Sequence, residues 1–476
     1  MKNYYWAAFI ITAVVVAALF LLGQLPDFQM FGRKMRRVDL LSDVRPDKPD
    51  TVAAADTVVL EALVERDVVI DYADTCWEGT TCITDYADTT MSGMDHFYAM
   101  LDSIDLIDRP VRVAVFGDSF IEGDIFTADL REMLQDRYGG CGVGWVNITS
   151  NVANFRPTVV HRFGGWRTRS AVDSIYDRKF LGLNSSYSLP VAAESYVELE
   201  CTSRYASHVG RAEVSRLYFR ADSDTVRLAY SLNGGEPNAI EMRGQGMKVA
   251  TVSGDIHSVK WTVGGTRAPF WGVALEGRRG IVVDNLSLRG SSGFNFLSIP
   301  QETLRQFAAR REYDLIILQY GLNVATADRR DYKGYKDNMV QVVGRLQECF
   351  PGTSIVLFSV GDRMSKDEDG DLVTMPGIVN LAGYQQAVAV DTGVAWWSLL
   401  DAFKSLGGIT AFAEAKPAMA NLDYTHINFR GGRRLAEEFF EALMCGKENY
   451  DNARAAAQGR EIKAQPTTEE RQLEQY

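Results

Sequence analysis

Residues 111–124, VRVAVFGDSFIEGD, contain an apolar run that stops at three small or polar residues. Five of the first six residues are apolar, which is typical of a strand buried on both faces of a parallel sheet. Residues 117–119 interrupt the run, and apolar side chains at helical spacing follow as far as Gly139 and Gly140. The pattern predicts a strand, a tight turn and a helix, with Ser119 in the turn.

The same alternation of strand and helix returns in the second half of the chain. Apolar runs occur at 280–293 (GIVVDNLSLRGSSG), 313–321 (YDLIILQYG) and 353–360 (TSIVLFSV), and helical patterns separate them. Strands that alternate with helices predict a mostly parallel sheet covered on both faces. Residues 179–279 instead contain short alternating runs broken by glycine and asparagine, such as TVRLAYSLNGG. This stretch predicts an antiparallel β sandwich inserted into the α/β domain.

The N-terminal residues 5–23 carry no charge and match the roughly 20 residues that an α-helix needs to cross a bilayer. No A-x-A cleavage site or lipoprotein cysteine follows them, so we expect an uncleaved transmembrane helix. One lysine precedes this segment and four basic residues follow it, which taken alone favours a cytoplasmic location for the rest of the chain.

These boundaries divide the chain into six predicted parts. They are a membrane anchor with its basic flank (1–37), an acidic stalk (38–93), the first part of the α/β domain (94–178), the inserted sandwich (179–279), the second part of the α/β domain (280–445) and a polar C-terminal tail (446–476).

Composition excludes some classes of partner. The net charge of −12 and the lack of a basic stripe argue against binding to nucleic acid. No metal-ligand spacing and no phosphate-binding loop occurs, so neither a metal nor a cofactor is predicted. Cys76 and Cys82, in CWEGTTC, either close a small disulfide loop in an oxidising compartment or are unrelated thiols.

Polar interruptions fall at the carboxyl ends of the predicted strands, where ligands collect in open parallel sheets. Ser119, Gly290 and Asn323 each follow a strand, and the DYTH loop at 423–426 precedes the last helix. Taken singly, Ser119 could simply be a helix N-cap. Together, these positions offer a hydroxyl nucleophile and backbone or amide donors for an oxyanion.

A serine becomes nucleophilic when a histidine takes its proton and a carboxylate holds that histidine. The chain has five histidines, and only His426 has an aspartate, Asp423, three residues earlier in the α/β part. A surface aspartate that caps the last helix beside a solvated histidine would give the same D-x-x-H pattern. The combination with Ser119 favours a catalytic triad.

These motifs resemble those of the SGNH (GDSL-type) hydrolase superfamily. GDS at 117–119 is similar to its first block, the glycine of LRGSSG to its second, GLN at 321–323 to its third and DYTH to its fifth. Two positions depart from the family pattern. Val324 stands where the third block usually has an acidic residue, and Phe120 stands where leucine is common after the serine.

The resemblance implies a flavodoxin-like, three-layer α/β/α fold with a parallel sheet. It also implies that Ser119 is the nucleophile and that Asp423 and His426 complete the triad. The same resemblance places the backbone of Ser119 together with Gly290 and Asn323 in the oxyanion hole.

The insertion between the first and second blocks is similar to that of bacterial peptidoglycan O-acetylesterases, whose inserted module resembles a carbohydrate-binding jelly roll. This likeness implies a serine esterase that removes O-acetyl groups from a cell-envelope glycan such as peptidoglycan. Such substrates lie outside the cytoplasmic membrane, so we expect a single-pass bacterial inner-membrane protein with its catalytic domain in the periplasm. Two alternatives remain: a glycan O-acetyltransferase that uses the same triad beside a membrane acyltransferase, and a non-catalytic glycan-binding protein.

Trp166 and Arg167, in GGWRTRS, are further candidates for substrate binding. An exposed indole stacks on sugar rings and a guanidinium holds carboxylates. Ordinary packing and surface charge would explain the same two residues.

Overall fold

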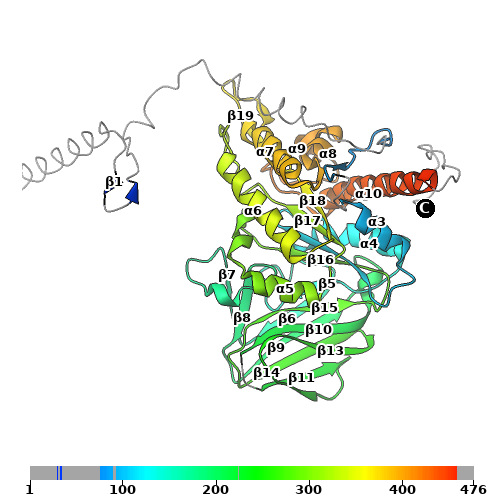
Figure 1. Cartoon of the computed structure of the whole chain (residues 1–476), viewed down its shortest axis with the longest axis vertical. Helices are drawn as coiled ribbons and strands as arrows, with labels where there is room; N and C mark the ends of the chain where they lie inside the picture. Colours follow the sequence, from blue (N-terminus) through cyan, green and yellow to red (C-terminus); the bar gives the residue numbers. More distant parts are fainter. Residues whose placement is uncertain (1–28, 31–32, 35–74, 89–92, 223–224, 458–476) are drawn as a thin grey trace, which may run out of the picture. The chain divides into compact units, whose positions relative to one another are not determined.

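The computed structural model describes residues 29–30, 33–34, 75–88, 93–222 and 225–457 (Figure 1). The chain divides into two compact units, Met1–Glu65 and Arg66–Tyr476. In the first unit the described residues form one short antiparallel pair, β1 (Gln29–Met30) and β2 (Arg33–Lys34). The predicted membrane helix at 5–23 lies outside the described residues. Among the helices that are described, none is long and apolar enough to span a bilayer.

The second unit contains a six-stranded sheet in the order β16-β4-β17-β18-β21-β3. The first five strands run parallel, and the short β3 pairs antiparallel with β21 at one edge. Their bounds are β3 Thr84–Asp85, β4 Val111–Gly117, β16 Ile281–Ser287, β17 Leu315–Gln319, β18 Ser354–Phe358 and β21 Ala395–Trp397. Every residue of β4, β17 and β18 is buried, as their continuous apolar sequences predict.

Two groups of helices pack on this sheet (Figure 1). In one group α4 (Thr127–Tyr138) contacts α10 (Phe429–Ala457), and in the other α6 (Lys333–Cys349) contacts α5 (Gln301–Arg310) and α7 (Pro376–Thr392). The order of the strands reverses direction at β4, so right-handed crossovers place the two groups on opposite faces. The predicted mixed α/β fold with a parallel sheet is confirmed. The smaller elements are α3 Asp95–Asp102, α8 Leu399–Ser405, α9 Gly408–Glu414 and the hairpin β19 Met364–Lys366 with β20 Leu372–Thr374.

The inserted region forms two antiparallel sheets that pack face to face. One has the order β13-β10-β15-β8-β7, with β5 also paired to β15, and the other has the order β12-β11-β14-β9-β6. Buried apolar residues from both sheets share one core that includes Phe219, Trp261 and Phe270. The bounds are β5 Gly144–Asn147, β6 Val159–Gly164, β7 Trp166–Ser170, β8 Ser186–Pro190, β9 Glu194–Cys201, β10 Ala212–Ala221, β11 Val226–Leu232, β12 Asn238–Met242, β13 Gly246–Ile256, β14 Ser258–Gly264 and β15 Phe270–Glu276.

The sandwich begins earlier than the predicted boundary at 179. Strands β5, β6 and β7 lie between Gly144 and Ser170 and belong to the two antiparallel sheets. Three of the five residues of β7 are exposed, so its sequence lacks the apolar alternation that identifies a half-buried strand.

Two segments expected to lie outside the folded domain are part of it. Helix α10 continues to Ala457, beyond the predicted domain end at 445, and Tyr450 packs on Tyr98 with ring centroids 5.7 Å apart. The last part of the predicted stalk contributes β3, and Trp397 donates a hydrogen bond from Nε1 to the Thr81 carbonyl at 2.8 Å. These contacts with distant residues have no local sequence signal.

A buried ionic cluster joins the sandwich to the α/β domain. Arg311 contacts Glu276, at the end of β15, at 3.0 Å, and Asp284, in β16, at 2.6 Å, and all three side chains are fully buried. Burial alone would raise the pKa of Asp284, but the charge of Arg311 and its hydrogen bonds lower it. Arg112 of β4 adds a second pair to Glu276 at 2.9 Å. The sandwich is therefore fixed to the sheet that carries the candidate nucleophile.

Candidate active site

The turn after β4 places Ser119 at the carboxyl end of the central sheet. Gly117 permits close packing there, because a Cβ at this position would lie 2.9 Å from the Gln319 carbonyl oxygen of the neighbouring strand. Asp118 is fully buried, and its Oδ1 accepts the Phe120 N–H at 2.9 Å. Ser119 follows it and is half-buried. The predicted strand and turn are confirmed, and Asp118 holds the turn from inside.

The DYTH loop joins a carboxylate to the histidine ring. His426 Nδ1 lies 2.8 Å from Asp423 Oδ2, and Asp423 Oδ1 accepts the N–H groups of Thr425 and His426 at 3.0 Å each. Tyr424 adopts a φ of 48°, the left-handed conformation that folds the loop back on itself. An N–H at Nδ1 that donates to Asp423 leaves Nε2 as the proton acceptor.

Hydrogen bonding to the Asp423 carboxylate outweighs its partial burial. Burial raises the pKa, but the backbone and ring N–H groups of His426 and the N–H of Thr425 lower it below the usual value. Asp423 is therefore ionised at neutral pH and able to stabilise a protonated imidazole.

Helix α10 brings the histidine loop toward the serine turn. It begins three residues after His426, and a Cβ at Gly432 in its first turn would lie 1.7 Å from the Ile125 carbonyl oxygen. Only glycine allows the helix to lie this close to the segment that follows Ser119. The charge of His426 also acts on the carboxyl group of Asp118, the neighbour of Ser119.

Among the described residues, no hydrogen bond joins the Ser119 hydroxyl to the His426 ring. Catalytic hydrogen bonds are often long in unliganded enzymes and tighten when substrate binds. The predicted triad therefore stays a prediction, with its Asp423–His426 contact formed.

The candidate oxyanion donors come from the next two strand ends. Gly290 has a φ of 78°, is exposed, and has no atom within 4 Å of the place where a Cβ would lie. Asn323 Nδ2 donates to the Ser291 carbonyl at 2.9 Å and to Asp118 Oδ2 at 3.3 Å. The ends of β4, β16 and β17 thus meet at one point, as the sequence predicts.

The loop that carries Asn323 is ordered without the acidic residue that the family usually has at the next position. Val324 and Ala325 donate backbone hydrogen bonds to the Gly321 carbonyl at 3.0 and 3.1 Å. Both N–H groups of the Asn323 side chain already have acceptors, so an oxyanion would have to share or replace the longer bond to Asp118.

Asp118, the residue before the candidate nucleophile, contacts the next strand end through its side chain. Burial raises the pKa of Asp118 to about 6. Hydrogen bonds from the backbone N–H groups of Phe120, Leu322 and Gly321 lower this pKa, but by less than burial raises it. Asp118 Oδ2 orients the Asn323 amide, which is a contact between positions 205 residues apart. Only the order GDS followed by GLN in the sequence hints at it.

An ion pair beside the serine turn could not be identified from the sequence either. Arg289, next to Gly290, pairs with Glu122 at 2.5 Å, and the Glu122 N–H donates to the Ser119 carbonyl at 3.4 Å. The Arg289 side chain is 67% exposed, so a positive group borders the site from the solvent side.

Trp166 and Arg167 lie on β7 of the sandwich. Trp166 donates from Nε1 to the Tyr196 carbonyl at 2.7 Å, and its ring meets Phe270 edge-on with centroids 5.3 Å apart. Arg167 is exposed. Packing accounts for the position of the indole, and substrate binding by this pair stays a prediction.

Glu132, Asp136 and His208 form a cluster of residue types that bind metals, where α4 meets the sandwich. His208 Nε2 lies 2.7 Å from Asp136, and Glu132 accepts the N–H groups of Ser207 at 2.6 Å and His208 at 3.3 Å. These contacts explain the cluster as a junction between the two domains.

Comparisons with known proteins identify the fold. No protein-family model matches the sequence, and the search of curated proteins found no match. The structure is similar to that of a peptidoglycan O-acetylesterase, with a TM-score of 0.63 and 20% sequence identity over 77% of this chain and 99% of that one.

Two further solved structures give weaker matches. They are a family two carbohydrate esterase from Cellvibrio japonicus (TM-score 0.26, 10% identity, 60% of this chain and 98% of that one) and a GDSL-like lipase described as putative from Parabacteroides merdae (TM-score 0.26, 14% identity, 35% and 74%). The likeness to the peptidoglycan O-acetylesterase shows that this chain shares the fold of that protein.

Proposed function

We propose that the protein is a serine esterase that removes O-acetyl groups from a cell-envelope glycan. Two observations support this proposal: the Asp423–His426 pair, whose charge acts on Asp118 beside Ser119, and the Asn323 amide, which donates to the same Asp118. Acyl transfer needs these three parts: a nucleophile, a base held by a carboxylate, and donors for the oxyanion.

In the proposed reaction, Ser119 Oγ attacks the acetyl carbonyl carbon while His426 Nε2 takes the hydroxyl proton. The backbone N–H groups of Ser119 and Gly290 and the Asn323 amide stabilise the negative oxygen. The C–O bond to the sugar then breaks, and His426 returns its proton to the leaving sugar hydroxyl. His426 then takes a proton from a water molecule, whose oxygen attacks the acetyl carbon of the acyl-enzyme. The bond to Ser119 Oγ breaks, acetate leaves, and His426 returns the proton to Ser119.

The substrate class and the location belong to this proposal. Structural likeness to a peptidoglycan O-acetylesterase extends over 99% of that protein. The Cys76–Cys82 disulfide favours an oxidising compartment. We propose an inner-membrane anchor at 5–23 and a periplasmic catalytic domain, which a cytoplasmic signal from a C-terminal topology reporter would contradict.

The test uses the full-length protein in detergent with O-acetylated peptidoglycan. We expect release of acetate, labelling by a fluorophosphonate probe, and loss of both in Ser119→Ala. New O-acetyl groups on an added glycan, in place of free acetate in solution, would favour the transferase reaction. If the wild-type protein neither reacts with the probe nor releases acetate, the remaining hypothesis is a non-catalytic glycan-binding protein.

A further inference from the structure

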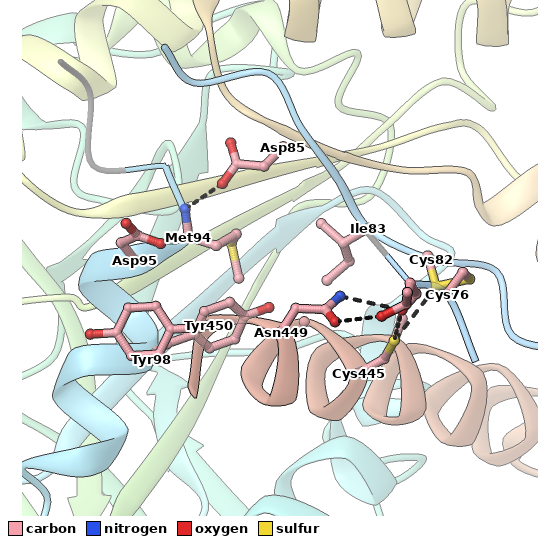
Figure 2. A pocket seen from close by; sticks show the side chains of 13 residues that line it. Cys76, Cys82, Ile83, Asp85, Met94, Asp95, Tyr98, Cys445, Asn449 and Tyr450 are labelled. Atoms are coloured by element: carbon pink, nitrogen blue, oxygen red, sulfur yellow. Dashed lines mark hydrogen bonds between the residues drawn. A yellow bond between two sulfur atoms is a disulfide. The ribbon is translucent and has the colours of Figure 1, made fainter. Parts of the chain in front are cut away.

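Three cysteine sulfur atoms from two distant parts of the chain lie together beside helix α10 (Figure 2). Cys76 and Cys82 form a disulfide in the segment before the catalytic domain. The Sγ of Cys445, in α10, lies 3.8 Å from the Sγ of Cys82. A cysteine sulfur is thus in contact with one specific sulfur of an existing disulfide.

Hydrogen bonds to one face of α10 hold the disulfide loop in this place. Positions 441, 445, 448 and 449 follow helical spacing and share that face. Trp77 donates to Glu448 at 2.8 Å, Thr80 to Glu441 at 3.4 Å, and Thr75 exchanges two hydrogen bonds with Asn449, at 3.1 and 3.3 Å. The sulfurs are therefore held together by the fold on both sides of Cys445.

The three cysteines differ in exposure. Cys76 is exposed and Cys82 is half-buried, whereas Cys445 is only 1% exposed. A cavity of about 70 Å³ borders all three. External reagents therefore reach Cys76 first, and Cys445 is accessible mainly to Cys82.

We propose that Cys76, Cys82 and Cys445 form a thiol–disulfide exchange site. The Cys445 thiolate attacks Cys82 Sγ, the Cys76–Cys82 bond breaks and a Cys82–Cys445 bond forms. Cys76 leaves as a thiolate and takes up the proton that Cys445 gives up. The step is an isomerisation with no net oxidation, so it needs no added oxidant.

The exchange changes what the disulfide connects. The bond moves from two cysteines six positions apart to two that are 363 positions apart. The new bond fastens the segment that enters the domain to the helix that begins just after His426. It also converts a buried thiol into an exposed one at Cys76, which is then open to small disulfides and to redox proteins.

The first test maps the disulfides of the wild-type protein. The full-length protein in detergent is equilibrated in a glutathione redox buffer, quenched with acid, alkylated and digested without reduction for mass spectrometry. We expect peptides linked through both Cys76–Cys82 and Cys82–Cys445, with Cys76 alkylated in the second form. Cys445→Ser should contain only the first form, and Cys349→Ser, which removes a buried thiol elsewhere, should match the wild type.

The second test removes the competing partner. In Cys76→Ser, oxidised glutathione should drive formation of a Cys82–Cys445 bond, while Cys76→Ser/Cys445→Ser should hold only a glutathione adduct at Cys82. Circular dichroism checks that both variants are folded. A wild type with the Cys76–Cys82 form alone after equilibration, or a folded Cys76→Ser with no Cys82–Cys445 bond, overturns the proposal.

Discussion

The candidate site is bordered by two aspartates whose surroundings are opposite. Asp118 is fully buried at the end of β4, and burial raises its pKa to about 6. Asp423 is half-exposed on the DYTH loop, and hydrogen bonds from His426 and Thr425 lower its pKa. The same side chain is thus assigned two tasks by its environment. Asp423 is kept charged to hold the histidine, whereas Asp118 holds the asparagine amide and the serine turn.

The largest loss of activity should come from substitution of Ser119, the serine that both aspartates support. Ser119→Ala should lower kcat for acetyl ester hydrolysis by about 10⁶-fold, because the nucleophile is lost. Acetate release and thermal unfolding should be measured together. An unchanged Tm with residual activity above about 1% of the wild type would show that Ser119 is not the nucleophile.

The exposed aspartate should come next. Asp423→Asn should lower kcat by about 10⁴-fold, because an amide stabilises the wrong tautomer of His426 and cannot stabilise its charged form. Asp401→Asn, an exposed aspartate on α8, is the matched control and should retain full activity. Equal activity of both variants would assign Asp423 only to holding the turn of the DYTH loop.

The amide that Asp118 orients should have a smaller effect. Asn323→Ala should lower kcat by about 10²- to 10³-fold with little change in KM, since an oxyanion donor acts mainly in the transition state. The control is Asn338→Ala on α6, where the amide bonds only to a backbone carbonyl of its own helix. A rise in KM without a fall in kcat would instead indicate that Asn323 binds the ground-state ester.

The buried aspartate should be most visible in stability. The pKa of Asp118 is raised, so the folded state binds its proton more tightly than the unfolded state, and ionisation lowers stability by about 3 kcal/mol as pH rises from about 4 to above 6. Asp118→Asn removes this term, so its Tm relative to the wild type should rise across that range. The control Asn338→Ala removes no titratable group and should give a flat difference.

The sign should reverse for the exposed aspartate. Asp423 has a lowered pKa, so its contribution is present above the pKa of the unfolded state and is lost as pH falls. A Tm difference for Asp423→Asn that has the same slope as that for Asp118→Asn would remove the contrast between the two carboxylates.

The strand ends of the site could be predicted because each is a local signal. A run such as VRVAVF can only be buried, so the polar residues after it must lie at the edge of the sheet. The contact between Asp118 and Asn323 could not be predicted, since it depends on the order of strands β4 and β17 in the sheet. Strand β7 was missed because it is mostly exposed and shows no apolar alternation.

The contacts of the disulfide loop were equally invisible in the sequence. Thr75 and Cys445 are 370 residues apart, and nothing near either position indicates the other. Residues 446–476 were expected to be a tail because the segment is highly polar, and Lys447 and Arg454 belong to it. Both instead pair with Asp102 of α3, at 2.7 and 2.8 Å.

The buried cluster around Arg311 bears on how such a protein can be altered by recombination. Exchanging the sandwich for a module without a carboxylate at the position of Glu276 would leave Arg112 of the central sheet buried under the new module without that partner. An unpaired buried charge costs several kcal/mol, a large part of the stability of a domain. The sandwich therefore cannot be exchanged independently of the α/β domain. A chimera in this lineage would have to carry Arg112, Glu276 and Arg311 as a set.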